Sequence, residues 1–124
     1  MKVLHTDKAP AAVGPYSQAI KVGDFIFTSG QLALDPETGD LINHDIEAAA
    51  RRSLDNVQAI LVEAGSSLEK VVKSTIFLSD MENFGKVNEI YSEYFSEHKP
   101  ARSCVEVARL PKDALIEIEV VALA

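Results

Sequence analysis

The strands expected in this sequence are apolar on both of their alternating faces, yet the chain offers only two helices to cover them. Around residues 24–29 the two phenylalanines Phe25 and Phe27 alternate with Ile26. In the segment 115–123 the two alternating sets are Leu115, Val121 and Leu123 against Ile116, Ile118 and Val120. Two helices can cover one face of such a sheet, so the second apolar face has to meet something else. Another copy of the same chain is the simplest partner, and the pattern therefore predicts an oligomer.

The apolar periodicity predicts the element order β-β-α-β-α-β-β. The clearest helix spans 44–64, with Asn43 as a candidate N-cap and Gly65 as a candidate C′ residue. A second helix is expected over about 82–96, opened by Asp80 and buried along Phe84, Val87, Ile90 or Tyr91, and Tyr94 or Phe95. Strands are expected in a hairpin about Gly23-Asp24, at 71–78, and at about 103–109 and 115–123. The fold class is therefore α/β: a mixed β-sheet with two helices packed on one face.

Length and charge limit the possible functions. A chain of 124 residues is expected to form one domain, 1–124, that needs no disulfide or metal to fold. The net charge of −7 works against binding nucleic acid or an anionic membrane surface. The N-terminus has no signal-peptide pattern, no stretch is long enough to span a membrane, and Cys104 is the only cysteine. We expect a cytoplasmic protein with no nucleic-acid or membrane partner.

Arg102 is the residue that most needs an explanation. It stands at the start of a predicted strand, directly after Pro-Ala and two positions before Cys104. A guanidinium stays charged and presents a planar fork of donors that matches a carboxylate. A surface position or an ordinary salt bridge would account for it. If it is held at a sheet end or an interface, however, it needs an internal acid or the carboxylate of a ligand, because an unpaired buried charge is costly.

Two glutamates could supply the acid. Glu117 and Glu119 share one face of the last predicted strand, roughly 6.6–7 Å apart. A solvated strand face would explain them, although Val121 and Leu123 share that face. If 103–109 and 115–121 form a hairpin, Arg102 lies near both acids, and a cation beside a carboxylate would suit a small anionic substrate and a water molecule.

Other reactive groups give weaker signals. No histidine is placed to activate Cys104, so a buried apolar cysteine is favoured over a nucleophile. The histidines show no metal-ligand spacing, and no nucleotide-binding glycine motif is present, so neither a metal nor a cofactor is expected. Ser29-Gly30 ends a strand, where backbone N–H groups could face a ligand, and Tyr16 follows a Gly-Pro turn as either a lid or a packing residue.

Four stretches together resemble a known family. These are GPYSQAI at 14–20, TSGQ at 28–31, SLDNV at 53–57 and PARSCVEVARLPKDALIEIE at 100–119. The chain resembles the RidA (YjgF-like) imine deaminases from about residue 8 to its end. One position departs from the commoner pattern, because Asn83 stands before Phe84 where an acid often precedes that phenylalanine.

The resemblance implies a fold, an assembly and a reaction. The fold would be the chorismate-mutase-like (YjgF-like) fold, in a homotrimer with clefts between subunits. The activity would be that of a cofactor-free hydrolase acting on C=N bonds. It would convert 2-iminopropanoate and 2-iminobutanoate to 2-keto acids and ammonia, and so protect pyridoxal-phosphate enzymes from imine and enamine damage.

The resemblance also assigns residues. Arg102 would hold the substrate carboxylate, and Glu117 would position the attacking water, with Glu119 as the reserve candidate. Tyr16, the backbone of Ser29 and Gly30, and the backbone of Cys104 would line the cleft. The alternatives are a regulatory module that binds small carboxylates or keto acids between subunits without turnover, and a nucleic-acid binder or nuclease, which the net charge disfavours.

Overall fold

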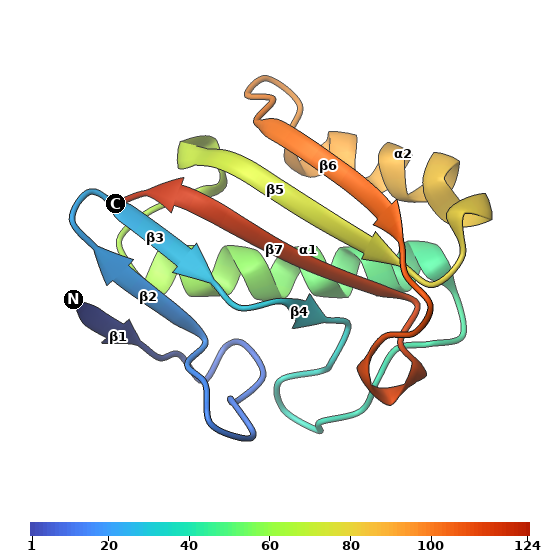
Figure 1. Ribbon diagram of the computed structural model, residues 1–124, viewed down its shortest axis with the longest axis horizontal. Helices are drawn as coiled ribbons and strands as arrows, with labels where there is room; N and C mark the ends of the chain where they lie inside the picture. Colours follow the sequence, from blue (N-terminus) through green and yellow to red (C-terminus); the bar gives the residue numbers. More distant parts are fainter.

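The computed structural model describes residues 1–124 and has a sheet covered by helices on one side only (Figure 1). Three short 3₁₀ helices interrupt the connections, η1 (Leu68–Lys70), η2 (Met81–Asn83) and η3 (Pro111–Asp113). The strands and helices in chain order are β1 (Lys2–Leu4), β2 (Ala19–Val22), β3 (Phe25–Thr28), β4 (Gln31–Leu32), α1 (Ile46–Glu63), β5 (Val71–Leu78), α2 (Phe84–Tyr94), β6 (Ala101–Glu106) and β7 (Ile116–Leu123).

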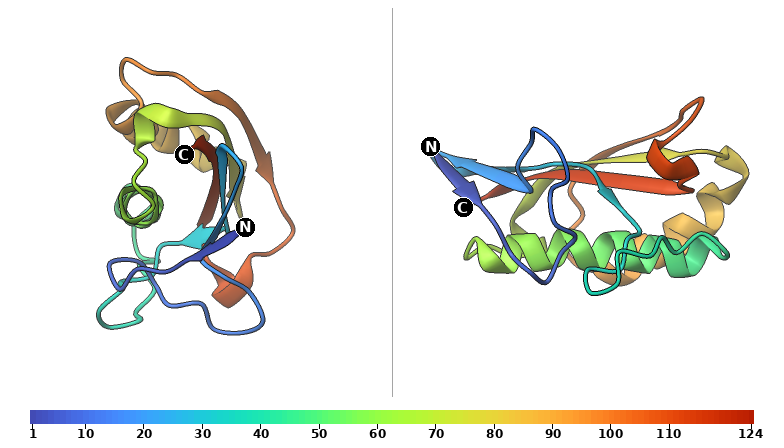
Figure 2. Two further views of the ribbon diagram at one scale, coloured as in Figure 1. Left: turned by 90° about the vertical axis from the view of Figure 1, so that its left-hand side faces the viewer. Right: turned by 90° about the horizontal axis from the view of Figure 1, so that it is seen from below.

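The strand order across the sheet is β1-β2-β3-β7-β5-β6, and β4 continues beyond β3 along β7. All neighbours are antiparallel except β5 and β6, which run parallel. Both helices lie behind the sheet in Figure 1 and beneath it in the right-hand view of Figure 2. The prediction of a mixed sheet with two helices on one face is confirmed. No helix combines the length and the apolar character needed to cross a membrane.

Helix α1 forms the main core with the sheet. Its residues Leu54, Val57 and Leu61 are fully buried, as the helical spacing predicted. The predicted cap was wrong by two residues, because Asp45 rather than Asn43 accepts the hydrogen bond from the amide of Ala48 (2.9 Å). After the helix, Gly65 adopts a positive φ of 80°, which confirms its predicted role in ending α1.

Helix α2 packs beside α1 and is shorter than expected. Asp80 caps the 3₁₀ turn η2 by accepting from the amide of Glu82, and the α-helix begins only at Phe84. Val87, Ile90 and Tyr91 are buried as predicted. Phe84 is 38% exposed, so its predicted place in the buried stripe was wrong.

The predicted hairpin between the last two strands was also wrong. β6 pairs with β5 at the edge of the sheet, and β7 inserts between β3 and β5. The sequence analysis also missed β1 and β4, which are only three and two residues long. Strands this short carry too few alternating positions to be recognised from a pattern.

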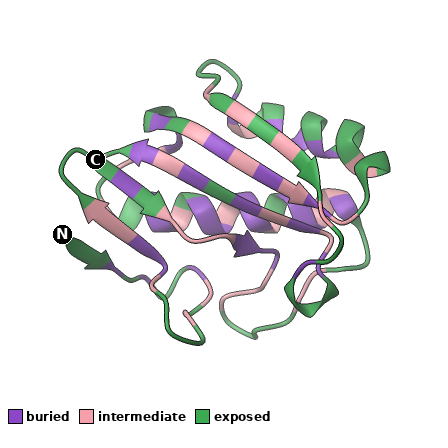
Figure 3. Ribbon diagram, viewed as in Figure 1, coloured by how far each residue is buried: buried purple, intermediate pink, exposed green.

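The face of the sheet opposite the helices is uncovered and carries exposed apolar side chains, as predicted. Phe25 and Phe27 remain 42% and 45% exposed, and Leu123 beside them is 42% exposed. In Figure 3 exposed and buried positions alternate along β3 and β7, since every second side chain points to this face. We refer to it below as the open face.

The buried layer between sheet and helices should dominate stability. Ile76 on the central strand β5 is 1% exposed, and Ile76→Ala should lower the free energy of unfolding by about 2–5 kcal/mol because it leaves a cavity. Urea denaturation measures the change, with Val62→Ala at a 61% exposed position of α1 as the control. Similar losses in the two variants would contradict this description of the core.

Candidate functional site

The residues singled out from the sequence fall into two separate hollows. A pocket of about 470 Å³ is lined by Tyr16, Ser29, Gly30 and Glu117, which come from three different parts of the chain. A second hollow of about 380 Å³ lies at the far side of the sheet and contains Arg102. We call these the glutamate pocket and the arginine hollow.

Glu117 lies in the glutamate pocket at the point where β4 pairs with β7. Its carboxylate rests directly on Gly30, since a methyl group added at that glycine would come within 2.6 Å of the Glu117 Cδ atom. The side chain is half-buried. Loss of solvation raises the pKa of Glu117 above its usual value, and the nearby charge of Glu119 raises it further. A carboxyl group with a raised pKa is suited to both accept and return a proton.

Ser29 ties this strand end to the preceding loop. Its amide donates to the carbonyl oxygen of Gln18 (2.9 Å), and its hydroxyl donates to that of Ser17 (2.6 Å). The hydroxyl is therefore occupied by the backbone, so Ser29 serves here to shape the pocket.

Tyr16 stands at the rim of the pocket. The ring is 53% exposed, and its hydroxyl oxygen accepts a hydrogen bond from the amide of Val13 (3.4 Å). Gly14 between them has φ +126°, a conformation that favours glycine. This geometry confirms the predicted turn, and the exposure places Tyr16 as a rim residue and not as part of the core.

Two further residues of the glutamate pocket were not found from the sequence, Gln18 and Lys112. Gln18 is 2% exposed, and a buried amide leaves no periodic signal. Lys112 lies in η3 with φ 59°, an uncommon conformation for a residue with a side chain. Asn43 holds this turn, because its side-chain nitrogen donates to the carbonyl oxygen of Asp113 (3.1 Å) and its oxygen accepts from the amide of Leu115 (3.1 Å).

Arg102 faces helix α2 from the edge strand β6. Its Nη1 donates to the side-chain oxygen of Asn88 (2.7 Å), and its guanidinium carbon lies 4.8 Å from the ring centroid of Tyr91 and 5.6 Å from that of Phe84. None of the three ion pairs in the structure involves Arg102. The guanidinium is oriented by an amide and two rings but is not neutralised, which leaves it able to bind an anion.

Cys104 lies two residues along the same strand and is half-buried. Burial raises the pKa of its thiol, an effect that the charge of Arg102 only partly opposes, so the thiol stays protonated at neutral pH. This agrees with the predicted inert cysteine. Directly after β6 the amide of Val107 donates to the carbonyl oxygen of Leu78 (2.9 Å). Since amide directions alternate along a strand, the amides of Arg102 and Cys104 point to the free edge of the sheet.

Arg102 and Glu117 do not meet within one chain. Their strands β6 and β7 are separated by β5, so they lie two strand spacings apart, roughly 9–10 Å across the sheet. They also occupy opposite faces, because Arg102 packs toward α2 and Glu117 points to the open face. The expected closeness of Arg102 to the glutamates was wrong, since it depended on the hairpin that does not form. Glu119 is exposed on the open face, outside the residues that line the glutamate pocket.

Metal-binding side chains are dispersed. No group of three or more His, Cys, Asp or Glu side chains is arranged to hold a metal ion. The ionisable groups that line the glutamate pocket include the carboxyl group of Glu117 and the ammonium group of Lys112, and the arginine hollow contains the Arg102 guanidinium.

Comparisons with known proteins agree on one family. The family model described as endoribonuclease L-PSP matches residues 6–124. A RutC family protein of Pyrococcus abyssi is 58% identical over 121 residues, which cover 98% of this chain and 95% of the relative. TdcF of Escherichia coli, named as a candidate reactive intermediate deaminase, is 47% identical over 125 residues, which cover 98% and 96% of the two chains.

Solved structures give the same result. The structure of E. coli TdcF with bound serine superposes with a TM-score of 0.96 at 46% identity and covers 100% of this chain and 99% of that one. The E. coli yjgF gene product superposes with a TM-score of 0.95 at 49% identity and covers 99% and 98%. The predicted YjgF-like fold is confirmed.

The raised pKa of Glu117 predicts a pH-dependent stability. Between the ordinary pKa of 4.5 and the raised folded value, the folded chain binds the proton more tightly than the unfolded chain, so stability falls as pH rises. Glu117→Gln removes this penalty and should be more stable than the parent at pH 7, with the gain vanishing below about pH 4. Urea titrations across this range measure it, and Glu119→Gln should give a smaller gain. Parallel pH profiles for the parent and Glu117→Gln would contradict the prediction.

Proposed function

The chain belongs to the endoribonuclease L-PSP family, the family of YjgF and RidA, and on that premise we propose that it hydrolyses small 2-imino acids to 2-keto acids and ammonia. The substrates proposed are 2-iminopropanoate and 2-iminobutanoate, and the role is protection of pyridoxal-phosphate enzymes from these reactive compounds. The observation that carries the proposal is the pair formed by an un-neutralised guanidinium and a half-buried carboxyl group of raised pKa.

The proposed site lies between subunits. Because Arg102 and Glu117 of one chain face opposite ways, one small substrate can touch both only if they come from two chains. The uncovered apolar face around Phe25, Phe27 and Leu123 supports association. We therefore propose a homotrimer in which the arginine hollow of one subunit meets the glutamate pocket of the next, with three such sites in a closed ring.

The proposed reaction needs few groups. The Arg102 fork binds the substrate carboxylate, assisted by the free edge amide of Cys104. Glu117 accepts a proton from a water molecule as its oxygen bonds to the carbon of the protonated imine, forming a neutral carbinolamine. Glu117 then returns the proton to the nitrogen, the C–N bond breaks with its electron pair on ammonia, and Glu117 passes the hydroxyl proton to that ammonia as the keto group forms. Orientation supplies much of the rate, because an iminium carbon already attracts water.

Binding without turnover is the main alternative. The serine bound to TdcF, at 46% identity, supports a site for small amino-acid-like molecules, and such a site could serve a sensor. Following keto-acid release while an amino-acid oxidase generates the imine separates the two readings, since a sensor would not accelerate it.

Cleavage of RNA is favoured by names alone: the family model is described as an endoribonuclease, and similar solved structures from Thermotoga maritima and Entamoeba histolytica carry the same description. A net charge of −7 gives RNA little electrostatic attraction. An RNA that shifts in a gel and is cut by this protein, with loss of both effects in salt, would support this second candidate.

Arg102→Lys tests the proposed carboxylate contact. Lysine keeps the charge but loses the planar fork and its stacking on Tyr91, so kcat/KM for imine hydrolysis should fall by about 100-fold. The measurement is the oxidase-coupled assay of keto-acid release. Arg51→Lys is the matched control, because Arg51 pairs with Glu93 on the helical surface. An Arg102→Lys variant as fast as the parent would contradict the assignment. If Lys112→Met lost activity while Arg102→Lys kept it, the carboxylate contact would be assigned to Lys112 in the glutamate pocket.

A further inference from the structure

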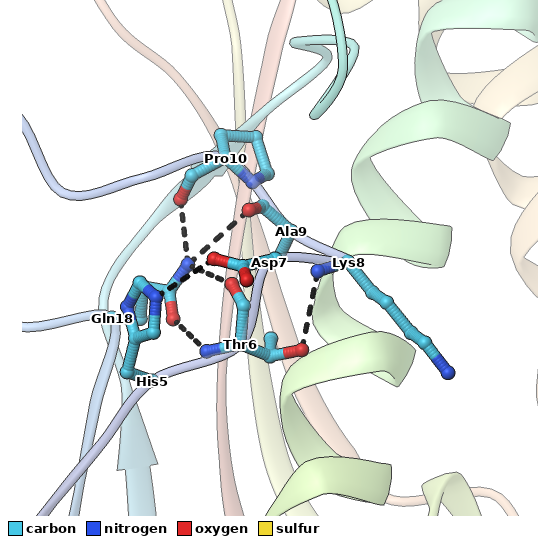
Figure 4. A network of polar contacts seen from close by, with 7 residues as sticks. All are labelled: His5, Thr6, Asp7, Lys8, Ala9, Pro10 and Gln18. Carbon is cyan, nitrogen blue, oxygen red and sulfur yellow. Dashed lines mark hydrogen bonds and ion pairs between the residues drawn. The ribbon is translucent and has the colours of Figure 1, made fainter.

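We propose that Gln18 is a positioning residue that fixes the outer wall of the glutamate pocket and thereby sets its affinity for substrate. The kinetic part of this inference rests on the proposed function, whereas the structural part does not. The side chain reaches across to residues 6–10, a stretch without regular secondary structure, and Figure 4 shows its amide surrounded by their backbone.

The Gln18 amide is fully engaged. Its oxygen accepts from the amide of Thr6 (2.7 Å), while its nitrogen donates to the carbonyl oxygens of Thr6 (3.0 Å) and Pro10 (2.8 Å). A longer contact reaches the carbonyl oxygen of Ala9 (3.3 Å). Only an uncharged amide supplies this combination of one acceptor and two donors on a single side chain. Because Gln18 is 2% exposed, loss of these bonds would leave buried backbone groups unpaired.

These bonds act directly on the pocket. Pro10, Ala11, Val13 and Tyr16 all line the glutamate pocket, and Gln18 itself lines it. The pocket is also lined by residues 29–32, where β3 ends and β4 follows, and by Glu117. The loop 11–16 is anchored at both of its ends. Before it, the carbonyl oxygen of Pro10 accepts a hydrogen bond from the Gln18 side chain, and after it the carbonyl oxygen of Ser17 accepts one from the Ser29 hydroxyl.

Within that loop the internal restraints are few. The amide of Tyr16 donates to the carbonyl oxygen of Gly14 (2.9 Å), and the amide of Val13 donates to the Tyr16 hydroxyl oxygen (3.4 Å). The separation between the Tyr16 rim and the Glu117 carboxylate therefore depends on the two anchors at Pro10 and Ser17. Release of the Gln18 anchor should widen the pocket without altering the carboxyl group itself.

A purely structural role would give a different result. If Gln18 only stabilised the fold, its loss would lower the amount of folded protein and reduce kcat in proportion, with KM unchanged. A positioning role predicts that KM rises while kcat per folded molecule is retained. The two roles are distinguished by whether KM or kcat changes, together with hydrogen exchange measured on the loop.

The experiment compares the full-length parent with Gln18→Met, which keeps the length and removes the hydrogen bonds. Gln58→Met, at an exposed position of α1, is the matched control. Hydrogen exchange of residues 6–16, calorimetric binding of 2-oxobutanoate and the oxidase-coupled kinetics are measured on each protein. We expect exchange of 6–16 to speed up about tenfold or more, and Kd and KM to rise about tenfold with kcat within about twofold.

Gln18→Glu is the second variant. A carboxylate would face the three carbonyl oxygens, so binding of 2-oxobutanoate should weaken further at pH 7 and partly recover near pH 5, where the acid is protonated more often. Unchanged exchange in 6–16, or unchanged Kd in Gln18→Met, would overturn the inference. So would acceleration of exchange throughout the chain. If the parent binds 2-oxobutanoate but hydrolyses no imine, the proposed function fails, while the exchange and binding results still decide the role of Gln18.

Discussion

The two helices cover only one face of the sheet, and the arrangement of every candidate residue follows from this constraint. Side chains alternate along β6 and β7, so Arg102 points into the helical layer and Glu117 points to the open face. The helical layer gives the guanidinium fixed aromatic and amide neighbours. On the open face the carboxyl group of Glu117 is half-buried and lies directly against the backbone of Gly30. The exposed apolar side chains of Phe25, Phe27 and Leu123 on this face are themselves a reason to associate.

The two hollows are chemically complementary although they lie apart. One offers a cation that no carboxylate of the chain neutralises. The other offers a carboxyl group whose pKa is raised by burial and by Glu119. If the two hollows met between neighbouring subunits, the guanidinium would bind the carboxylate of a small acid and the carboxyl group would position a water molecule at its other end. The proposed reaction needs no nucleophilic cysteine: the Cys104 thiol remains protonated because burial raises its pKa, and its backbone amide points to the free edge of the sheet.

Local sequence patterns predicted much of this structure, but contacts between residues far apart in the chain could not be predicted from them. Short stretches of sequence were enough to predict the apolar stripe of α1 and the glycine that ends this helix. They were also enough to predict the strands that are apolar on both faces. The pairing of β6 with β5 was not predicted, because a parallel partner 28 residues away leaves no trace in either strand. Asn43 looked like a helix cap yet binds the turn at Asp113, seventy residues on. Gln18 was missed because its side chain donates to backbone carbonyl oxygens. Every residue has such a group, so these contacts leave no pattern in the sequence. Arg102, Glu117, Tyr16, Ser29 and Gly30 were singled out from motifs and each lines one of the two hollows, but their distribution over two hollows required the topology.

The central claim is that one site is built from two chains, and subunit complementation tests it most directly. Arg102→Ala and Glu117→Gln would each be inactive alone in the oxidase-coupled assay. When the two are unfolded together at equal amounts and refolded, random assembly places an intact Arg102 opposite an intact Glu117 in roughly a quarter of the sites. The account predicts recovery of about that fraction of the parent's keto-acid release. Mixed assemblies that form, as native mass spectrometry would show, but remain inactive would contradict it, because residues acting within one chain cannot complement.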